Sequence, residues 1–182
     1  MQSCTSLEPI FEPGAAQGAA QWYAAFTRSN FEKRVASDLA GKGLTHFLPV
    51  VRETHQWKDR RKFVDVPVFP GYVFVHMTDS DQNRLRVLRS NGAVRILGSG
   101  GAIEPVPDGE IESIRMLLQS GVPFVAHPFL REGTRVRVKR GALKDLEGAL
   151  VRFKNDARLV VSVNLLAQSI ALEIDVADVE AV

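Results

Sequence analysis

A proline and a glycine stand together inside a strongly apolar run, Phe69-Pro70-Gly71-Tyr72-Val73-Phe74-Val75. Proline cannot donate to a sheet ladder and glycine has no side chain to pack, so the pair indicates a bend or an edge in the sheet that this run joins. Beyond the bend, alternation at period two puts Tyr72 and Phe74 on one face of a strand and Val73 and Val75 on the other. One set of side chains can fill a core, and the other either fills a second core or lines a surface.

A second patterned segment lies near the C-terminus. Residues 134–139 alternate polar and apolar side chains, and Gly133, Gly141 and Gly148 punctuate the region. Short strands joined by tight turns over about 50 residues are typical of a small β-barrel. Residues 164–182 are rich in Ala and Leu and fit either a strand or a helix, and we expect a stable barrel that includes them.

The first half of the chain carries alternating strand and helix patterns. Residues 21–27 are rich in aromatic and strand-forming types and predict a strand. The motif that follows matches a capping box, in which Ser29 accepts from the Glu32 amide while the Glu32 carboxylate reaches back. Apolar side chains then recur at helical spacing as far as Leu39, and Gly41 can supply the left-handed stop.

Two long extended segments, residues 45–53 and 63–75, flank a charged arm over residues 54–62 and predict a hairpin with a basic tip. The later elements expected in this half are a short helix for which Asp79-Ser80-Asp81 offers N-caps, a strand over residues 93–97 and a helix opened by Pro107-Asp108. This order predicts an α+β fold in which helices pack on an antiparallel sheet, followed by the small β-barrel.

Composition divides the chain into four parts. Residues 1–20 have too few large apolar side chains to offset the entropy of ordering them, which predicts a disordered N-terminal extension. Residues 21–120 form the α+β domain and residues 131–182 the barrel. Between them, Gly-Val-Pro and His-Pro breakers mark residues 121–130 as a linker.

Groups capable of covalent chemistry are sparse. The four histidines are scattered, and none pairs with a cysteine or an acid at metal-ligand spacing. The single cysteine, Cys4, lies in the N-terminal extension and cannot form an internal disulfide. Acids around residues 104–112 fall at a predicted helix start, where the helix dipole favours them. We therefore expect no enzyme, no metal site and no cofactor.

The formal net charge of +2 conceals an uneven distribution of charge. Residues 131–144 hold six basic side chains against the single acid Glu132. The arm carries a second basic group beside Trp57, consisting of Lys58, Arg60, Arg61 and Lys62. Trp57 could stack on a base or brace the hairpin tip, and the arm is either a phosphate-contacting element or a solvated loop.

Nothing near the start of the chain resembles a secretory signal, because residues 1–21 contain no Lys or Arg and no long apolar run. No stretch approaches the roughly 20 apolar residues that cross a bilayer. A single cysteine is compatible with a reducing compartment. We expect a cytoplasmic protein.

Three segments in this order resemble the bacterial NusG family of transcription elongation factors, in which an NGN domain precedes a KOW domain. They are Trp22-Tyr23, the run from Phe69 to Val75, and the glycine-punctuated basic segment of residues 133–148. The resemblance covers nearly everything after residue 20. Trp57-Lys58-Asp59-Arg60 looks closer to the specialised antitermination paralogues of the UpxY, LoaP and RfaH kind than to the housekeeping factor.

The resemblance implies a factor that binds RNA polymerase through its NGN domain and bridges the clamp to suppress pausing or termination. The residues that match the apolar surface for the clamp helices of the largest polymerase subunit are Trp22, Tyr23, Phe69, Pro70, Gly71, Tyr72 and Val73. Non-template DNA or nascent RNA would then face the basic arm. Without a polymerase partner, the alternative is a standalone RNA-binding or ribosome-associated KOW module.

The KOW domain of the family implies contact with a ribosomal protein or Rho, in a factor that is monomeric and not bound to a membrane. The positions that match its loop are Arg137, Lys139, Gly141, Leu143, Lys144 and Gly148. Ala142 and Leu143 depart from the housekeeping Gly-Pro-Phe pattern, so a termination-factor contact at this loop does not follow from the resemblance.

Overall fold

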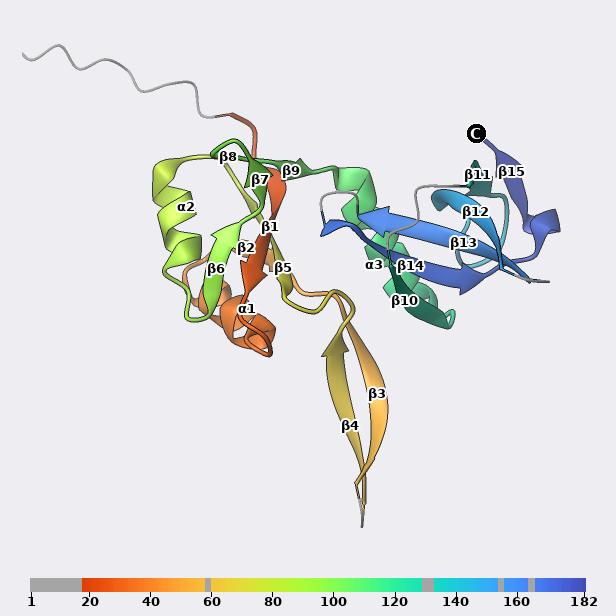
Figure 1. Cartoon of the computed structure of the whole chain (residues 1–182), viewed down its shortest axis with the longest axis horizontal. Coiled ribbons are helices and arrows are strands. Elements are labelled where there is room, and N and C mark those ends of the chain that lie inside the picture. Colours follow the sequence, from red (N-terminus) through yellow and green to blue (C-terminus); the bar gives the residue numbers. More distant parts are fainter. Residues whose placement is uncertain (1–17, 58–59, 129–132, 154–155, 164–165) are drawn as a thin grey trace, which may run out of the picture.

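The computed structural model describes residues 18–57, 60–128, 133–153, 156–163 and 166–182 (Figure 1). The predicted N-terminal extension, residues 1–20, lies almost entirely outside this range, as does Cys4. Within the described residues, no helix is long and apolar enough to span a membrane.

The N-terminal half is built on an antiparallel sheet with the strand order β2-β5-β1-β6 and with β9 beside β1. Its strands are β1 (Gln21–Thr27), β2 (Thr45–Phe47), β5 (Tyr72–Met77), β6 (Ala93–Ile96) and β9 (Pro105–Val106). The two central strands are β1 and β5, which pair so that Phe26 lies opposite Tyr72 and Ala25 opposite Val73. This sheet is called the first sheet below.

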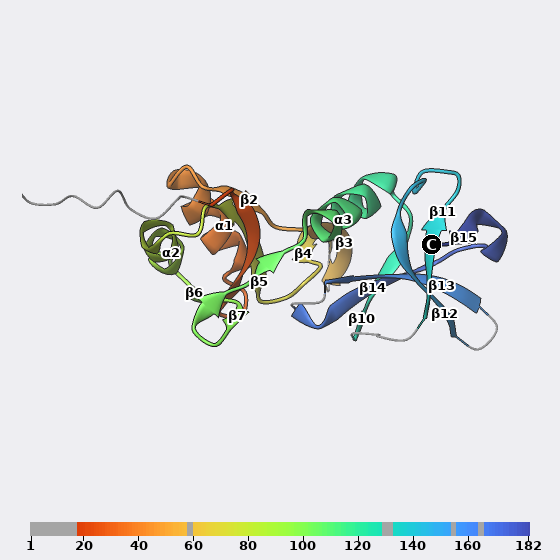
Figure 2. The same cartoon turned by 90° about the horizontal axis from the view of Figure 1, so that it is seen from above.

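Helices α1 (Glu32–Gly41) and α2 (Asp81–Leu88) cover one face of the first sheet (Figures 1 and 2). Val35 and Leu39 of α1 and Val87 of α2 are fully buried against that face. The predicted cap of α2 is confirmed, since the Ser80 hydroxyl accepts from the Asn83 amide at 3.3 Å. An oxygen at this position satisfies one of the free amides at the helix start.

The start and end of α1 differ from the sequence prediction. Phe31 takes the N-cap position and no side chain caps the helix, so the predicted capping box is wrong. The Glu32 carboxylate instead accepts from the backbone amide of Gly71, far along the chain. Gly41 remains inside the helix, and the left-handed residue after it is Gly43, with a φ of 67°. The Gly43 amide donates to the Ala40 carbonyl at 2.9 Å in the turn that follows, so the left-handed stop lies two residues beyond the predicted one.

The predicted hairpin is present and projects away from the first sheet (Figure 1). Its strands are β3 (Val50–Trp57) and β4 (Arg60–Pro67), which pair only with each other. The two long segments predicted to flank it are each divided, because β2 and β5 belong to the first sheet and the hairpin strands run on into the predicted arm. A second, very short hairpin joins β7 (Gly98–Ser99) to β8 (Ala102–Ile103).

Helix α3 (Asp108–Ser120) lies on the opposite side of the first sheet from α1 and α2 (Figure 2). Its start after Pro107 and its end at Gly121, where φ is 68°, are as predicted. Ile111, Ile114 and Leu117 are fully buried and belong to one apolar core that also includes residues of the C-terminal strands. Because α3 also packs on β13, it connects the first sheet to the C-terminal sheet.

The C-terminal sheet is antiparallel in the order β10-β14-β13-β12-β11-β15. Its strands are β10 (Phe124–Pro128), β11 (Thr134–Val138), β12 (Glu147–Phe153), β13 (Asp156–Val163), β14 (Gln168–Glu173) and β15 (Val179–Ala181), with a 3-10 turn at Val176–Asp178. The ambiguous segment, residues 164–182, therefore contributes strands. The α+β fold class with a small all-β C-terminal unit is confirmed.

The structure differs from the expected linker over residues 121–130. Phe124–Pro128 forms β10 and pairs with β14, so only residues 121–123 join α3 to the C-terminal sheet. The His-Pro pair suggested a break in the sequence. It is accommodated because β10 is the end strand in the order, and an edge strand tolerates proline.

Candidate docking surface on the first sheet

The face of the first sheet opposite α1 and α2 divides into a covered part and an accessible part. The covered part contains Trp22, which is only 6% exposed. The Arg115 guanidinium of α3 lies 5.0 Å from the Trp22 ring centroid and 5.1 Å from that of Phe47. These cation–π contacts hold α3 over this end of the face.

The accessible part is a row of side chains across β5, β1 and β6. Tyr72 and Phe26 are half-buried, with ring centroids 5.4 Å apart and ring planes tilted by 53°. The guanidinium of Arg95, an exposed residue, lies 5.7 Å from the Phe26 centroid. Together with the exposed Pro70, these residues are called the Phe26–Tyr72 patch. It presents aromatic surface beside a cation, a combination that is frequent in binding hot spots.

A tight turn leads into this patch. The Phe69 carbonyl accepts from the Tyr72 amide at 3.2 Å, with Pro70 second in the turn and Gly71 third, at a φ of 85°. This arrangement is typical of a type II β-turn, whose third position favours glycine. Phe69 points inward, is 1% exposed and packs edge-on against Phe74 at 6.1 Å. The turn is thus held from inside while Pro70 faces outward.

The structure separates the seven residues that the resemblance assigned to the polymerase surface. Tyr23 and Val73 lie on the α1/α2 face and are almost fully buried. Trp22 lies under α3 and Phe69 is in the core. Of the seven, only Pro70 and Tyr72 belong to the accessible patch, and Gly71 lies buried between them in the turn.

Phe26 and Arg95 belong to the accessible patch but were missed by the sequence reasoning. The alternation in β1 could have identified Phe26, because it lies on the same face as Trp22 at period two. Arg95 carried no such pattern. Its position opposite Phe26 depends on the register between β1 and β6.

The position of Tyr23 gives a testable pH dependence. Burial raises the pKa of the Tyr23 phenol above its ordinary 10.0, and the nearby Asp79 carboxylate raises it further. Above pH 10.0 the unfolded chain therefore loses this proton first, and the free energy of unfolding falls as pH rises. In Tyr23→Phe, we expect a shallower fall of the free energy of unfolding from about pH 9 upward, measured by urea unfolding. Identical slopes in the two proteins would contradict burial of this phenol.

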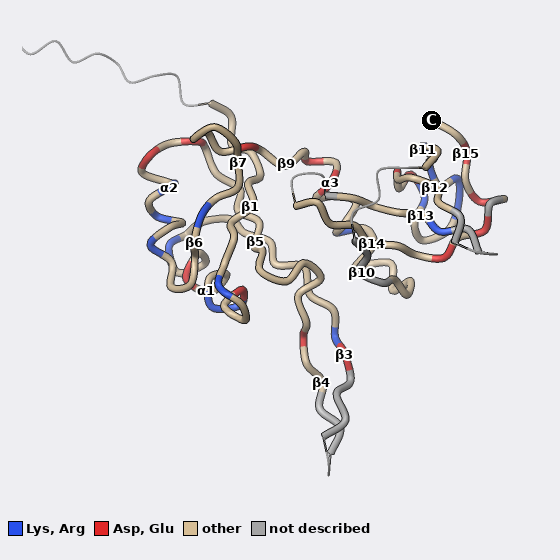
Figure 3. The backbone as a smooth tube through the Cα atoms, in the orientation of Figure 1, with Lys and Arg blue, Asp and Glu red and all other residues tan. Residues whose placement is uncertain are grey.

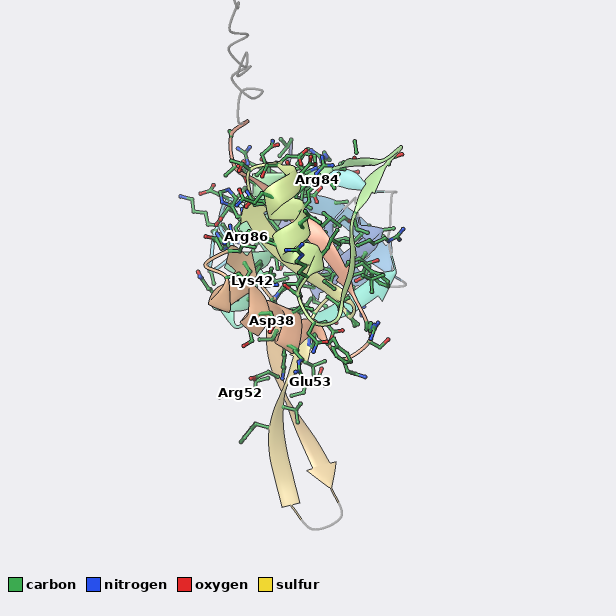
Figure 4. The ribbon with its side chains drawn as sticks, turned by 90° about the vertical axis from the view of Figure 1, so that its left-hand side faces the viewer. Asp38, Lys42, Arg52, Glu53, Arg84 and Arg86 are labelled. Atoms are coloured by element: carbon green, nitrogen blue, oxygen red, sulfur yellow. The ribbon has the colours of Figure 1, made fainter. Side chains whose placement is uncertain are left out.

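Charged side chains on the outer side of α1 and α2 tie the two helices together (Figure 4). The Lys42 ammonium donates to the Arg86 carbonyl at 2.9 Å and to the Ser90 hydroxyl at 2.8 Å, and the Arg86 guanidinium donates to the Lys42 carbonyl. The Asp38 carboxylate accepts from the Asn91 amide at 2.7 Å. These groups serve the packing of the helices.

At the start of α2, Asp79 and Arg84 form a two-pronged ion pair, with N–O distances of 2.6 and 2.7 Å. The hydrogen bond from Arg84 lowers the pKa of the Asp79 carboxyl. The carboxylate therefore stays ionised to a lower pH than an aspartate without such a partner.

The basic arm is described only in part. Its base carries a weak, exposed pair between Arg52 and Asp65 at 3.4 Å, and acidic and basic positions follow each other along the described strands (Figure 3). The backbone of Trp57 pairs with Arg60, and Arg61 and Lys62 continue β4. Lys58 and the side chains of all five predicted nucleic-acid contacts lie outside the described residues.

The loop after β11 divides the predicted KOW positions between core and surface. Leu143 is buried in the C-terminal core beside Leu146, so it is a packing residue. Gly148 has a packing role as well, because an added Cβ would lie 2.6 Å from the Val160 carbonyl oxygen. The exposed positions are Lys139, Gly141 and Lys144.

Arg137 is half-buried and pairs with Glu147 across β11 and β12. The distance between the guanidinium nitrogen and the carboxylate oxygen is 2.5 Å. This hydrogen bond raises the pKa of Arg137 further above its ordinary range. The pair links β11 and β12 on the surface of the C-terminal sheet.

A cleft of about 930 Å³ lies between α3 and the C-terminal sheet. Its lining includes Met116 of α3, Arg135 of β11 and Val182. Among the described residues, no group of three or more His, Cys, Asp or Glu side chains could hold a metal ion.

Comparison with known proteins identifies the family. The family model described as "Transcription termination factor nusG" matches residues 20–115, from just before β1 to the middle of α3. The chain belongs to the NusG family. The matched residues include the whole first sheet and the Phe26–Tyr72 patch.

Individual relatives agree along most of the chain. A NusG protein of Halalkalibacterium halodurans, named "Transcription termination/antitermination protein NusG", is 30% identical over 174 residues, covering 87% of this chain and 97% of the relative. The protein of the same name from Staphylococcus aureus strain Mu50 is 26% identical over 175 residues, covering 90% and 96%. NusG-family proteins are transcription factors and not enzymes, and this chain is a NusG-like transcription factor.

A solved structure supports the fold. The structure titled "Domain interaction in Thermotoga maritima NusG" superposes with a TM-score of 0.51 at 21% identity, covering 90% of this chain and 97% of that one. The similarity therefore extends beyond the first sheet into the C-terminal strands.

Proposed function

We propose that this NusG-family chain binds RNA polymerase through the Phe26–Tyr72 patch and suppresses pausing or termination by bridging the polymerase clamp. Residues 21–120 would act as the NGN domain. The KOW domain would begin at β10 and include the residues up to 182. A specialised antitermination role fits the Trp57-Lys58-Asp59-Arg60 sequence of the arm, and the arm would contact non-template DNA or nascent RNA.

One observation carries the proposal, which is the partial exposure of two touching aromatic rings, Phe26 and Tyr72, at the end of this face that α3 leaves uncovered. Phe26 and Tyr72 remain half-buried while Trp22 and Phe69 on the same side are covered. An amphipathic partner helix can lay its apolar side on such rings, and Arg95 at the rim would favour acidic side chains on that helix. The clamp helices of the polymerase are the partner that the family implies.

Tyr72→Ala tests the proposal directly. Loss of a buried aromatic contact in an interface costs about 2 kcal/mol or more, so the dissociation constant for RNA polymerase should rise about 30-fold. Binding of labelled full-length protein to core polymerase measures this change. Leu88→Ala is the matched control, because Leu88 is 40% exposed on α2, on the opposite side of the sheet.

Unchanged polymerase binding by Tyr72→Ala, or an equal loss in Leu88→Ala, would contradict the assigned surface. If the wild-type chain does not bind polymerase but binds RNA with a steep salt dependence, the alternative of a standalone RNA-binding or ribosome-associated module would replace the proposal. The absence of both interactions would reject both functions.

A further inference from the structure

A buried carboxylate connects α1 to the turn that carries the docking surface. Glu32 is the first residue of α1 and only 5% exposed. Its Oε1 accepts from the backbone amide of Gly71 at 2.7 Å, across 39 positions of the chain. Burying a carboxylate is costly unless it is hydrogen-bonded, so this contact fixes where both groups can lie. The dipole of α1 also favours a negative charge at this end of the helix.

Gly71 is held on both sides by this arrangement. Its amide donates to Glu32, and its carbonyl accepts from the Thr27 amide of β1 at 2.8 Å. An added Cβ on Gly71 would lie 3.3 Å from the Phe26 ring. The position of Gly71 therefore determines how the turn meets Phe26 and where Tyr72, the next residue, enters β5.

We infer that Glu32 is a positioning residue for the Phe26–Tyr72 patch, acting through the amide of Gly71. The inference rests on the proposed function, because it assigns Glu32 a role in polymerase binding without contact to polymerase. Pro70 and Tyr72 flank Gly71, so release of its amide lets the outward part of the turn move relative to Phe26. Gly71 is buried, so removing the Glu32 carboxylate removes the acceptor of its amide, and an unsatisfied buried donor is costly.

Glu32→Ala, Glu32→Gln and Val35→Ala form the test set. Glu32→Ala removes the acceptor, and we expect an affinity for RNA polymerase about tenfold weaker than that of wild type. Glu32→Gln keeps a side-chain carbonyl that can accept from Gly71, so it should restore affinity to within about threefold of wild type. Val35→Ala removes fully buried apolar volume one turn further along α1, so it lowers stability without touching the turn.

Two measurements on folded full-length protein separate positioning from general destabilisation. Polymerase affinity should follow the order wild type, Gln variant, Ala variant, with Val35→Ala close to wild type. Hydrogen exchange of the Gly71 amide, observed by NMR, should accelerate at least tenfold in Glu32→Ala and remain slow in Glu32→Gln and Val35→Ala.

Wild-type affinity in Glu32→Ala, an equal loss in Val35→Ala, or failure of Glu32→Gln to restore binding would each overturn the inference. A wild-type chain that does not bind polymerase would instead overturn the proposed function. In that case the hydrogen-exchange rate of the Gly71 amide alone tests whether Glu32 holds the turn. An unchanged rate in Glu32→Ala would show that it does not.

Discussion

Phe74→Ala is expected to lower the free energy of unfolding by about 3–5 kcal/mol, the range typical of a phenylalanine removed from a core. Phe74 is fully buried in the middle of β5, on the face opposite α1 and α2. Its ring packs edge-on against Phe69 at 6.1 Å and stacks with Phe47 at 6.2 Å. These neighbours come from the turn and from β2, so little can close the cavity that alanine would leave.

Urea unfolding followed by circular dichroism measures this loss. Since the free energy of unfolding of a domain is typically about 5–15 kcal/mol, the variant would keep only a small part of its stability. Val94→Ala on β6 is the matched control, because Val94 is 50% exposed and should change the free energy of unfolding by less than about 0.5 kcal/mol. A loss below about 1 kcal/mol in Phe74→Ala would contradict the close packing of this core.

Gly92→Ala is expected to cost about 3 kcal/mol or more, because two penalties act at one position. Gly92 has a φ of 104°, in the region that disfavours residues with a Cβ. The added Cβ would also lie 2.5 Å from Cδ1 and 2.6 Å from Cβ of Phe31. Relief requires Phe31, the N-cap residue of α1, to move, while the Gly92 carbonyl accepts from the Arg28 amide at 2.8 Å.

Gly101→Ala separates the two penalties. Gly101 has a φ of 86°, but an added Cβ there would meet no atom within 4 Å. It should show only the backbone penalty, about 1–2 kcal/mol. Thermal and urea unfolding of both variants measure the difference. Equal losses in the free energy of unfolding would show that Phe31 can move away from the new methyl group without destabilising the fold.

Local patterns in the sequence predicted most of the elements, because their causes lie within a few residues. Alternation correctly assigned Tyr72 and Phe74 to one face of β5 and Val73 to the other. The cap of α2 was predicted within Asp79-Ser80-Asp81, where Ser80 takes it, and Gly121 was predicted as the end of α3. The glycine-punctuated C-terminal pattern likewise predicted a small all-β unit.

Predictions failed where a residue's partner lies far along the chain. Glu32 fitted a local capping box, yet its carboxylate bonds to Gly71. The strand β10 was predicted as part of a linker because its partner β14 lies far along the chain, after β11, β12 and β13. An edge strand taken alone has little sequence pattern of its own. In both cases the long-range contact prevailed over the local one.

The sequence by itself determined most of the elements, the two faces of β5 and the membership of the NusG family. Only the tertiary structure decided which face remains accessible, since both faces of β5 are apolar and alternation cannot rank them. Packing of α1 and α2 buried Tyr23 and Val73, and Arg115 of α3 covered Trp22. Phe26 and Tyr72 stay accessible because α3 covers the other end of the same face. That outcome depends on where a helix docks in space, and no local spacing of residues encodes it.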